Sequence, residues 1–531
     1  MRRRNFIKCC SMALPGAVFA NSIGSTVLGE TGTIKVPRHR MYDDDFIKRA
    51  ADMAVQTAAG EGASYSDFRL SNFRSQNIST REQIIQGIWE NENFGFAVRV
   101  IIDGAWGFAA SSTFSEQEVI RITKIACSIA RANKSVQLNR VELVPTPVYN
   151  ETWNTPIRKN AFEVSIDDKV SKLFGINEKA KSLGADFCES FIWAVNEWKY
   201  FASSEGSYIK QDLHRLWSAF DVTVVDKESG NFETRDSFTS PIGKGYEYVE
   251  EYDYMKDLEE AVEHTKMKLK APSVEPAKRD LILDSNHLWL TIHESCGHPT
   301  ELDRALGYEA NYAGTSFMTP DKLGKLQYGS SLINMKGDRT QTDGLATRGF
   351  DDDGVKTTDW DIIKNGKFVG YQTTREMAKF IGESASNGCA YADSWDHFPI
   401  QRMPNVSLMP GEKKLSLNDL IADTEDGIYI KGSGSWSIDM QRYNFQFTGQ
   451  EFWEIKNGKI TGMLRDVAYQ GNTVDLWNSC DAICDKSEYK LGGSFFCGKG
   501  EPGQVSPVSH GSSPARFKKV NILNTSKEAG K

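Results

Sequence analysis

The chain has 531 residues, 40% of them hydrophobic and 25% charged, and a net charge of −8. A chain of this length exceeds one ordinary hydrophobic core, so we expect two or more domains. No basic stripe with interleaved aromatic residues is present, which argues against a nucleic-acid partner, and no apolar run is long enough to span a membrane.

The first twenty residues have the layout of an export signal. "MRRRNFIKCCSMALPGAVFA" combines a basic start, a short apolar stretch and a small residue at Ala20. Arg3 and Arg4, followed by "NFIK", resemble a twin-arginine signal. We predict a signal peptide at 1–20, a linker at 21–42 and a periplasmic location. If residues 1–20 are only a basic N-terminus, the expected location is the cytoplasm.

Residues 43–270 are predicted to form an N-terminal α+β region. Apolar residues recur at helical spacing over 43–59, and a second helix is expected over 115–133. Between them, "ENFGFAVRVIID" and "AWGFAASS" alternate in the period-two manner of strands. A second αβ pattern follows over 166–270, with a long helix near 255–269.

The segment "APSVEPAKRD" at 271–280 contains two prolines and indicates a domain boundary. Beyond it, short strands with glycine and asparagine turns dominate. The tetrapeptide "KNGK" occurs at 364–367 and 456–459, and Asn-Gly is the strongest short signal for a tight hairpin. We therefore predict an α+β protein whose residues 275–531 form a sheet-rich domain with one metal-binding helix.

The stretch "TIHESCGHPTELD" at 291–303 contains the candidate for that helix. His293 and Glu294 begin a near match to the zinc-peptidase signature H-E-x-x-H, but His298 follows five residues after His293 instead of four. Residues five apart point roughly 140° apart on a regular helix. The two histidines can share a metal only if the helix widens, as in a π-bulge, or ends between them. Gly297 would permit such a break.

A third ligand must come from elsewhere, because catalytic zinc usually has three protein ligands and an open position. The nearby candidates are Glu301, Asp303 and Cys296. The distant candidate is Cys497, in "GGSFFCGKGEPGQ". The residues alone leave this choice open.

Other cysteines and histidines receive plainer interpretations. Cys480 and Cys484 lie four residues apart, and we interpret them as two buried small residues rather than a metal or redox pair. His397, in "DHFPIQRMPN", is interpreted as a structural hydrogen-bonding residue, with substrate contact as the alternative. For His510, a position directly behind the metal ligands is the less favoured interpretation.

Several of these stretches together resemble the TldD/PmbA family of metallopeptidases, in particular its TldD-like branch. They are "GFAVRVIIDGAWGFAASS", "HESCGH", "DDDGVKTTDWDIIKNGKFVGY", "DHFPIQRMPN", "FTGQEFWEIKNGKITGMLRDVAYQGN" and "FCGKGEPGQ". The resemblance extends over most of residues 45–515, and the combination is far more specific than any single stretch.

The resemblance implies one zinc ion per chain, held by His293, His298 and Cys497, with Glu294 as the catalytic base. It implies hydrolysis of unfolded peptides or small unstable proteins. It also implies a dimer, either of two copies of this chain or of this chain with a related one. Most members are cytoplasmic, so the predicted export signal is a departure from the family pattern.

Two other functions compete with this one. The chain could be a scaffold or peptide-binding subunit with a structural metal, but a structural zinc site has no use for Glu294 and normally has four protein ligands. It could instead be a thiol enzyme that uses Cys497. That alternative leaves the His-Glu-His set unexplained.

Overall fold

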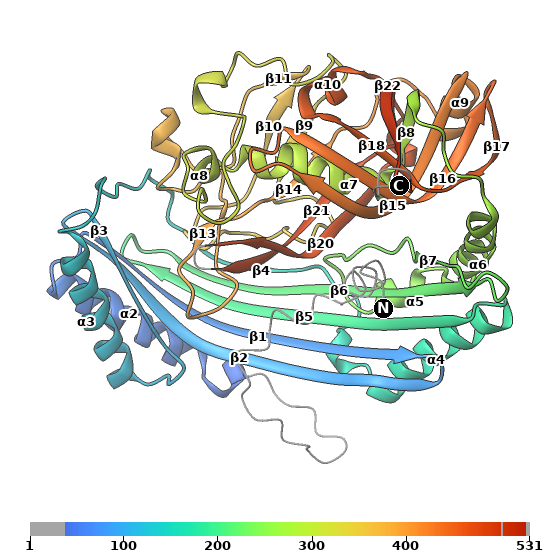
Figure 1. The fold of residues 1–531 in the computed structure, drawn as a ribbon. Helices are drawn as coiled ribbons and strands as arrows, with labels where there is room; N and C mark the ends of the chain where they lie inside the picture. Colours follow the sequence, from blue (N-terminus) through green and yellow to red (C-terminus); the bar gives the residue numbers. More distant parts are fainter. Residues whose placement is uncertain (1–37, 501–502, 527–531) are drawn as a thin grey trace. The chain divides into compact units, whose positions relative to one another are not determined.

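The protein is described by a computed structural model, which covers residues 38–500 and 503–526. The predicted export signal at 1–20 lies outside the described residues, as does most of the predicted linker at 21–42. Residues Arg38–Met41 form a short 3₁₀-helix. The fold is a mixed α+β arrangement, as expected, with an N-terminal αβ region and a sheet-rich C-terminal region (Figure 1). Among the described residues, no helix is both long and apolar enough to cross a membrane.

A seven-stranded sheet forms the centre of the N-terminal region. Its strand order is β3-β2-β1-β5-β6-β4, with β7 also paired to β6. All neighbours are antiparallel except β4 and β6. The strands are β1 (Tyr65–Arg81), β2 (Ile84–Ile102), β3 (Ala105–Ser111), β4 (Asn150–Asn154), β5 (Phe187–Ser203), β6 (Tyr208–Val225) and β7 (Phe232–Asp236).

Helices cover one face of this sheet and form two separate cores with it (Figure 1). The helices are α2 (Asp44–Gly60), α3 (Glu116–Asn133), α4 (Ile166–Ser182), α5 (Glu247–Glu251) and α6 (Tyr254–Lys270). The predicted helices at 43–59, 115–133 and 255–269 are thus confirmed. Ser115 caps α3, because its hydroxyl accepts a hydrogen bond from the Glu118 amide.

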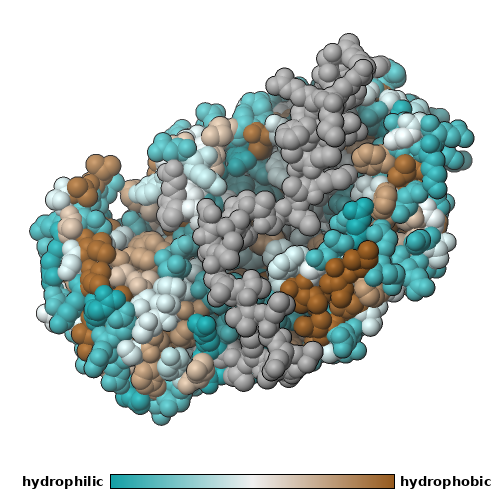
Figure 2. All heavy atoms as spheres, turned by 60° about the horizontal axis from the view of Figure 1, so that its bottom comes forward, coloured by the Kyte–Doolittle hydropathy of each residue, from teal (hydrophilic) through white to brown (hydrophobic). Residues whose placement is uncertain are grey.

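Apolar side chains also reach the surface on this side of the molecule, where Figure 2 shows them gathered in patches. The first half of β2 contributes Ile84 and Trp89, which are 62% and 56% exposed. That half pairs with β1 alone, since β3 begins its pairing at Phe96.

The other face of the sheet meets the C-terminal region through buried charges. Arg99 bonds Asp353 at 2.8 Å, and Lys199 bonds Asp352 at 2.8 Å. Arg215 donates to the Leu345 carbonyl at 3.2 Å. These contacts join β2, β5 and β6 to the segment 345–353, so the sheet supports the C-terminal region from below (Figure 1).

The C-terminal region contains short strands and short helices. Their bounds are β8 (Ala277–Leu283), α7 (Ser285–Ile292), α8 (Leu302–Ala305), β9 (Met335–Asp338), β10 (Asp359–Lys364), β11 (Lys367–Phe368), β12 (Ala390–Tyr391), β13 (Ile400–Gln401), β14 (Asn405–Leu408), α9 (Leu417–Ala422), β15 (Asp426–Ile438), β16 (Asn444–Lys456), β17 (Lys459–Leu464), β18 (Val467–Asn472), α10 (Thr473–Asn478), β19 (Cys480–Ile483), β20 (Lys490–Lys499), β21 (Gln504–Ser512) and β22 (Ala515–Asn524).

The largest sheet of this region runs β15-β8-β22-β18-β16-β17, and β15 also pairs with β16. Both predicted Asn-Gly hairpins are confirmed. They join β10 to β11 and β16 to β17, and in each turn the asparagine and the glycine both have positive φ.

Helix α7 lies inside the C-terminal region and contacts β14, β15, β20 and β21. Its apolar residues Leu288, Leu290 and Ile292 belong to the main hydrophobic core. Because these residues are buried, the next turn of the chain is held in a fixed position, and that turn contains the His-Glu pair.

Candidate metal centre

The His-Glu segment begins on a regular helix and then widens. The Asp284 carboxylate caps α7 by accepting a hydrogen bond from the Asn286 amide. After Ile292 the chain forms a π-helix over His293–Gly297, and the His298 amide donates to the His293 carbonyl. This bond spans five residues, so the two histidines lie one wide turn apart and their rings are 4.6 Å apart. The expected irregularity is therefore confirmed.

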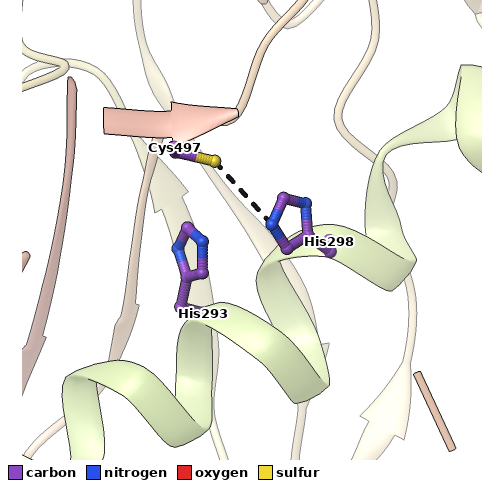
Figure 3. Close-up of side chains that lie close together, drawn as sticks. All are labelled: His293, His298 and Cys497. Carbon is purple, nitrogen blue, oxygen red and sulfur yellow. Dashed lines mark hydrogen bonds between the residues drawn. The ribbon is translucent and has the colours of Figure 1, made fainter. Parts of the chain in front are cut away.

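Cys497 lies on β20, and its side chain approaches the two histidines. The β20–β21 ladder changes register between Ser494 and Cys497, and such irregularities re-aim side chains next to functional sites. Its sulfur lies 3.7 Å from His298 Nε2 (Figure 3). The potential ligand atoms of His293, His298 and Cys497 all lie within 4.8 Å of one another, and all three residues are buried.

Hydrogen bonds fix which ring nitrogen of His293 is free. His510 Nδ1 is 2.7 Å from the Val406 carbonyl, which can only accept, so Nδ1 carries the hydrogen. His510 Nε2 is then an acceptor and takes a hydrogen bond from His293 Nδ1 at 2.7 Å. The remaining nitrogen of His293, Nε2, keeps its lone pair for a metal.

Glu301 has the same effect on His298. Its carboxylate accepts from His298 Nδ1 at 2.9 Å, which leaves His298 Nε2 free. Lys499 in turn holds Glu301 at 2.9 Å and Asp303 at 2.8 Å. Burial alone would raise the pKa of Glu301, but Lys499 and the bond from His298 outweigh it and hold that pKa below its usual value.

Burial favours the neutral form of His293, which is the form that binds a metal. Burial lowers the pKa of His293 below its ordinary value and lowers that of His510 further. Imidazoles and a cysteine form a donor set that suits zinc. The residues present therefore fit a zinc ion with three protein ligands.

Glu294 lies on the π-helix next to these ligands. Its Oε2 accepts a hydrogen bond from Arg442 at 2.8 Å. Burial would raise the pKa of Glu294, but His298 and His293 in their protonated forms, together with the positive charge of Arg442, outweigh it, so the pKa lies below the usual value. The carboxylate is consequently ionised at neutral pH and able to accept a proton.

The other sequence candidates are not members of the ligand cluster. Glu301 orients His298, and Asp303 pairs with Lys499. Cys296 is fully buried in the hydrophobic core, and burial raises its pKa. The backbone carbonyl of His397 accepts a hydrogen bond from Arg69.

Cys480 and Cys484 lie on and after a strand rather than on a helix. They are buried in two different apolar clusters, which is the arrangement expected of two packed small residues.

Arg442 and Lys499 were not identified from the sequence. Arg442 lies 148 residues from Glu294, and Lys499 lies 198 residues from Glu301. No local pattern links such pairs. The only available signal was the position of Lys499 two residues after Cys497.

Comparisons with known proteins identify a family that this chain resembles. Residues 276–524 match the profile of the PmbA/TldA metallopeptidase C-terminal domain, and residues 66–130 match that of PmbA/TldA metallopeptidase domain 1. Together the two profiles match more than half of the chain.

Curated relatives match over nearly their whole length. A metalloprotease of Methanocaldococcus jannaschii is 29% identical over 457 residues, which is 85% of this chain and 95% of the relative. A zinc metalloprotease TldD homologue of Saccharolobus solfataricus is 24% identical, over 90% of this chain and 98% of the relative. The crystal structure of TldE from Thermococcus kodakarensis has a TM-score of 0.70 at 17% identity and matches 89% of this chain and all of its own, which shows a shared fold.

Proposed function

Because the chain belongs to the TldD/PmbA family of metallopeptidases, we propose that it is a zinc-dependent peptidase that hydrolyses unfolded peptides or small unstable proteins. The supporting observation is the convergence of His293, His298 and Cys497 from two segments about 200 residues apart. We assign these three residues as the ligands of one zinc ion per chain and Glu294 as the catalytic base.

A zinc ion held there would act as a Lewis acid on the scissile carbonyl and lower the pKa of a water molecule toward about 7. Glu294 takes the proton from that water and returns it to the leaving amine. His510 and Glu301 hold the two histidine rings so that each Nε2 faces the ligand cluster. Lys499 holds Glu301 in place for this role.

The substrate is expected to be an extended segment of peptide. A chain in that conformation can pair with an exposed strand edge, which gives affinity with little sequence preference. The choice of unfolded peptides as the substrate class follows from the resemblance to the family.

The competing function is a non-catalytic scaffold or peptide-binding subunit with a structural metal. Three observations oppose it: the ligand cluster of the described residues has three members, the buried Glu294 lies beside it and bonds Arg442, and the matched relatives are metalloproteases. A structural zinc site normally closes with four ligands.

The protein is expected to act as a dimer, either with a second copy or with a related chain. The shared fold with TldE supports a partner of the same family. Export through the twin-arginine route stays a prediction, and so does the periplasmic location.

Metal analysis combined with cleavage of an unfolded peptide tests this function. We expect about one zinc per chain, cleavage that a chelator abolishes, and recovery when zinc is added back. A zinc-loaded protein without chelator-sensitive cleavage would favour the scaffold alternative.

A further inference from the structure

Arg442 occupies a backbone conformation that an arginine rarely adopts. It lies in the turn between β15 and β16, and its φ is +65°. The left-handed region is unfavourable for a residue with a Cβ, because the Cβ comes too close to the following carbonyl oxygen. Such strain persists only where the surrounding structure imposes it, and it clusters at functional sites.

The Asp439 carboxylate organises this turn from within. It accepts hydrogen bonds from the amides of Gln441, Tyr443 and Asn444 at 3.1, 2.8 and 2.9 Å. The Arg442 amide donates to the Asp439 carbonyl at 2.9 Å. The turn is therefore closed by its own residues.

Two other segments fix the turn from outside. The Thr315 and Phe317 amides donate to the carbonyls of Met440 and Gln441, both at 3.0 Å. The Thr473 hydroxyl donates to the Arg442 carbonyl at 2.9 Å. Hydrogen bonds from within the turn and from two other segments thus hold Arg442 in its strained conformation. In this conformation its guanidinium points toward the metal centre.

The guanidinium makes one ion pair there. Arg442 NH1 bonds Glu294 Oε2 at 2.8 Å, and the two side chains are only 15% and 7% exposed. Among the described residues no hydrogen bond to Glu294 Oε1 is found, and Arg442 Nε has no partner. One carboxylate oxygen is anchored while the other stays available.

We propose that Arg442 is a positioning residue that holds the Glu294 carboxylate in the one orientation in which Oε1 can take a proton from water. This inference rests on the proposed peptidase function. Without the anchor, Glu294 would turn toward other positive groups or solvent, and a misplacement of about 1 Å is enough to cost roughly 100-fold in rate.

Arg442→Gly is the most informative variant, because glycine adopts positive φ without strain and folding should therefore be retained. We expect unchanged zinc content, a lower Tm because buried Glu294 loses its ion-pair partner, a kcat lowered roughly 10- to 100-fold and a KM within about threefold of the wild type. Arg442→Lys should recover part of the activity, since it keeps a positive charge near Glu294.

Lys519→Gly provides a matched control. Lys519 is also a basic residue at positive φ (+53°), and it is exposed on β22 away from the metal centre. It should leave both kcat and KM unchanged.

A double-mutant cycle separates positioning from direct contact with substrate. In a Glu294→Gln chain, Arg442→Gly should change the residual kcat/KM by less than about twofold, because the carboxylate that Arg442 orients is absent. The proposal would be overturned if Arg442→Gly raised KM and left kcat unchanged. It would also be overturned if Arg442→Gly lowered kcat/KM by the same factor in the Glu294→Gln chain as in the wild type. If the wild type shows no chelator-sensitive cleavage, the proposed function fails first. If the wild type cleaves and Arg442→Gly cleaves equally well, only this inference fails.

Discussion

At the scale of single residues, the site depends on which ring nitrogen each histidine offers. His510 takes the Nδ1 hydrogen of His293, and Glu301 takes that of His298, so both Nε2 atoms keep a lone pair. Cys497 then completes a set of three ligand atoms. Ligand partners of this kind typically contribute roughly 10- to 100-fold to metal affinity.

Removing a ligand should remove the metal. Cys497→Ala and His293→Ala are each expected to lose zinc, because two remaining ligands cannot hold it against a chelator. Cys296→Ala is the matched control. Cys296 is close in sequence but packs in the core, so this variant should keep its zinc. Metal analysis of the purified variants measures this, and full zinc occupancy in Cys497→Ala would move the third ligand elsewhere.

At the scale of elements, the π-helix His293–Gly297 brings the side chains of His293 and His298 together although they are five residues apart. Gly297 was expected to permit a break through its backbone freedom, but its φ is −56°, which any residue adopts. Close packing favours the glycine instead, because the buried Met403 side chain lies against it. A Cβ at this position would lie 2.5 Å from Met403 Sδ.

Gly297→Ala should therefore disturb the π-helix. Either buried Met403 or the helix has to move, at a cost of about 1–3 kcal/mol. We expect a lower Tm and weaker zinc binding, measured by thermal unfolding and competition with a chelator. In a Met403→Ala chain, which has room for the methyl group, the same change should cost much less. Equal costs in the two backgrounds would show that Met403 is not the obstacle.

Local elements can be predicted from the sequence where local chemistry determines them. The Asn-Gly pairs predict both hairpins, and the spacing of His293 and His298 predicts an irregular helix if the two share a metal. The contacts of Arg442 and His510 cannot be assigned in this way, because they lie 148 and 217 residues from the side chains they touch. Only the tertiary fold brings them together.

At the scale of the whole described chain, the N-terminal sheet and the C-terminal region are joined by a buried layer of charges. Lys199 pairs with Glu197 at 2.7 Å and with Asp352 at 2.8 Å. Burial would raise the pKa of Glu197, but Lys199 and Arg215 outweigh it and lower that pKa to about 2. A carboxyl with a depressed pKa stabilises the fold above about pH 4.5, and this contribution is lost as the pH falls toward about 2.

Lys199→Ala should weaken this junction. It removes the Lys199 ammonium from the buried carboxylates of Glu197 and Asp352, and the loss of a buried ion-pair partner typically costs about 3–5 kcal/mol. The pKa of Glu197 should also rise, so acid unfolding should begin at a higher pH. Thermal unfolding across roughly pH 2–7 measures both effects. Lys356→Ala is the control: it breaks an exposed ion pair with Glu151 and should cost less than about 1 kcal/mol.

Export concerns the segment that precedes the described fold. Changing Arg3 and Arg4 to lysine should hold the protein in the cytoplasm, if the first twenty residues are a twin-arginine signal. Cell fractionation measures the outcome. Unchanged delivery to the periplasm would exclude that route and leave an ordinary secretory signal.

The most direct test of the account is the turnover of Glu294→Gln on an unfolded peptide, with zinc content measured on the same preparation. Glutamine is nearly the same shape as glutamate but cannot accept the proton from water, and Glu294 is not an assigned ligand. We predict that zinc stays at about one per chain while cleavage falls by roughly 10²–10⁴-fold. Retained zinc with undiminished cleavage would contradict the assignment of Glu294 as the base.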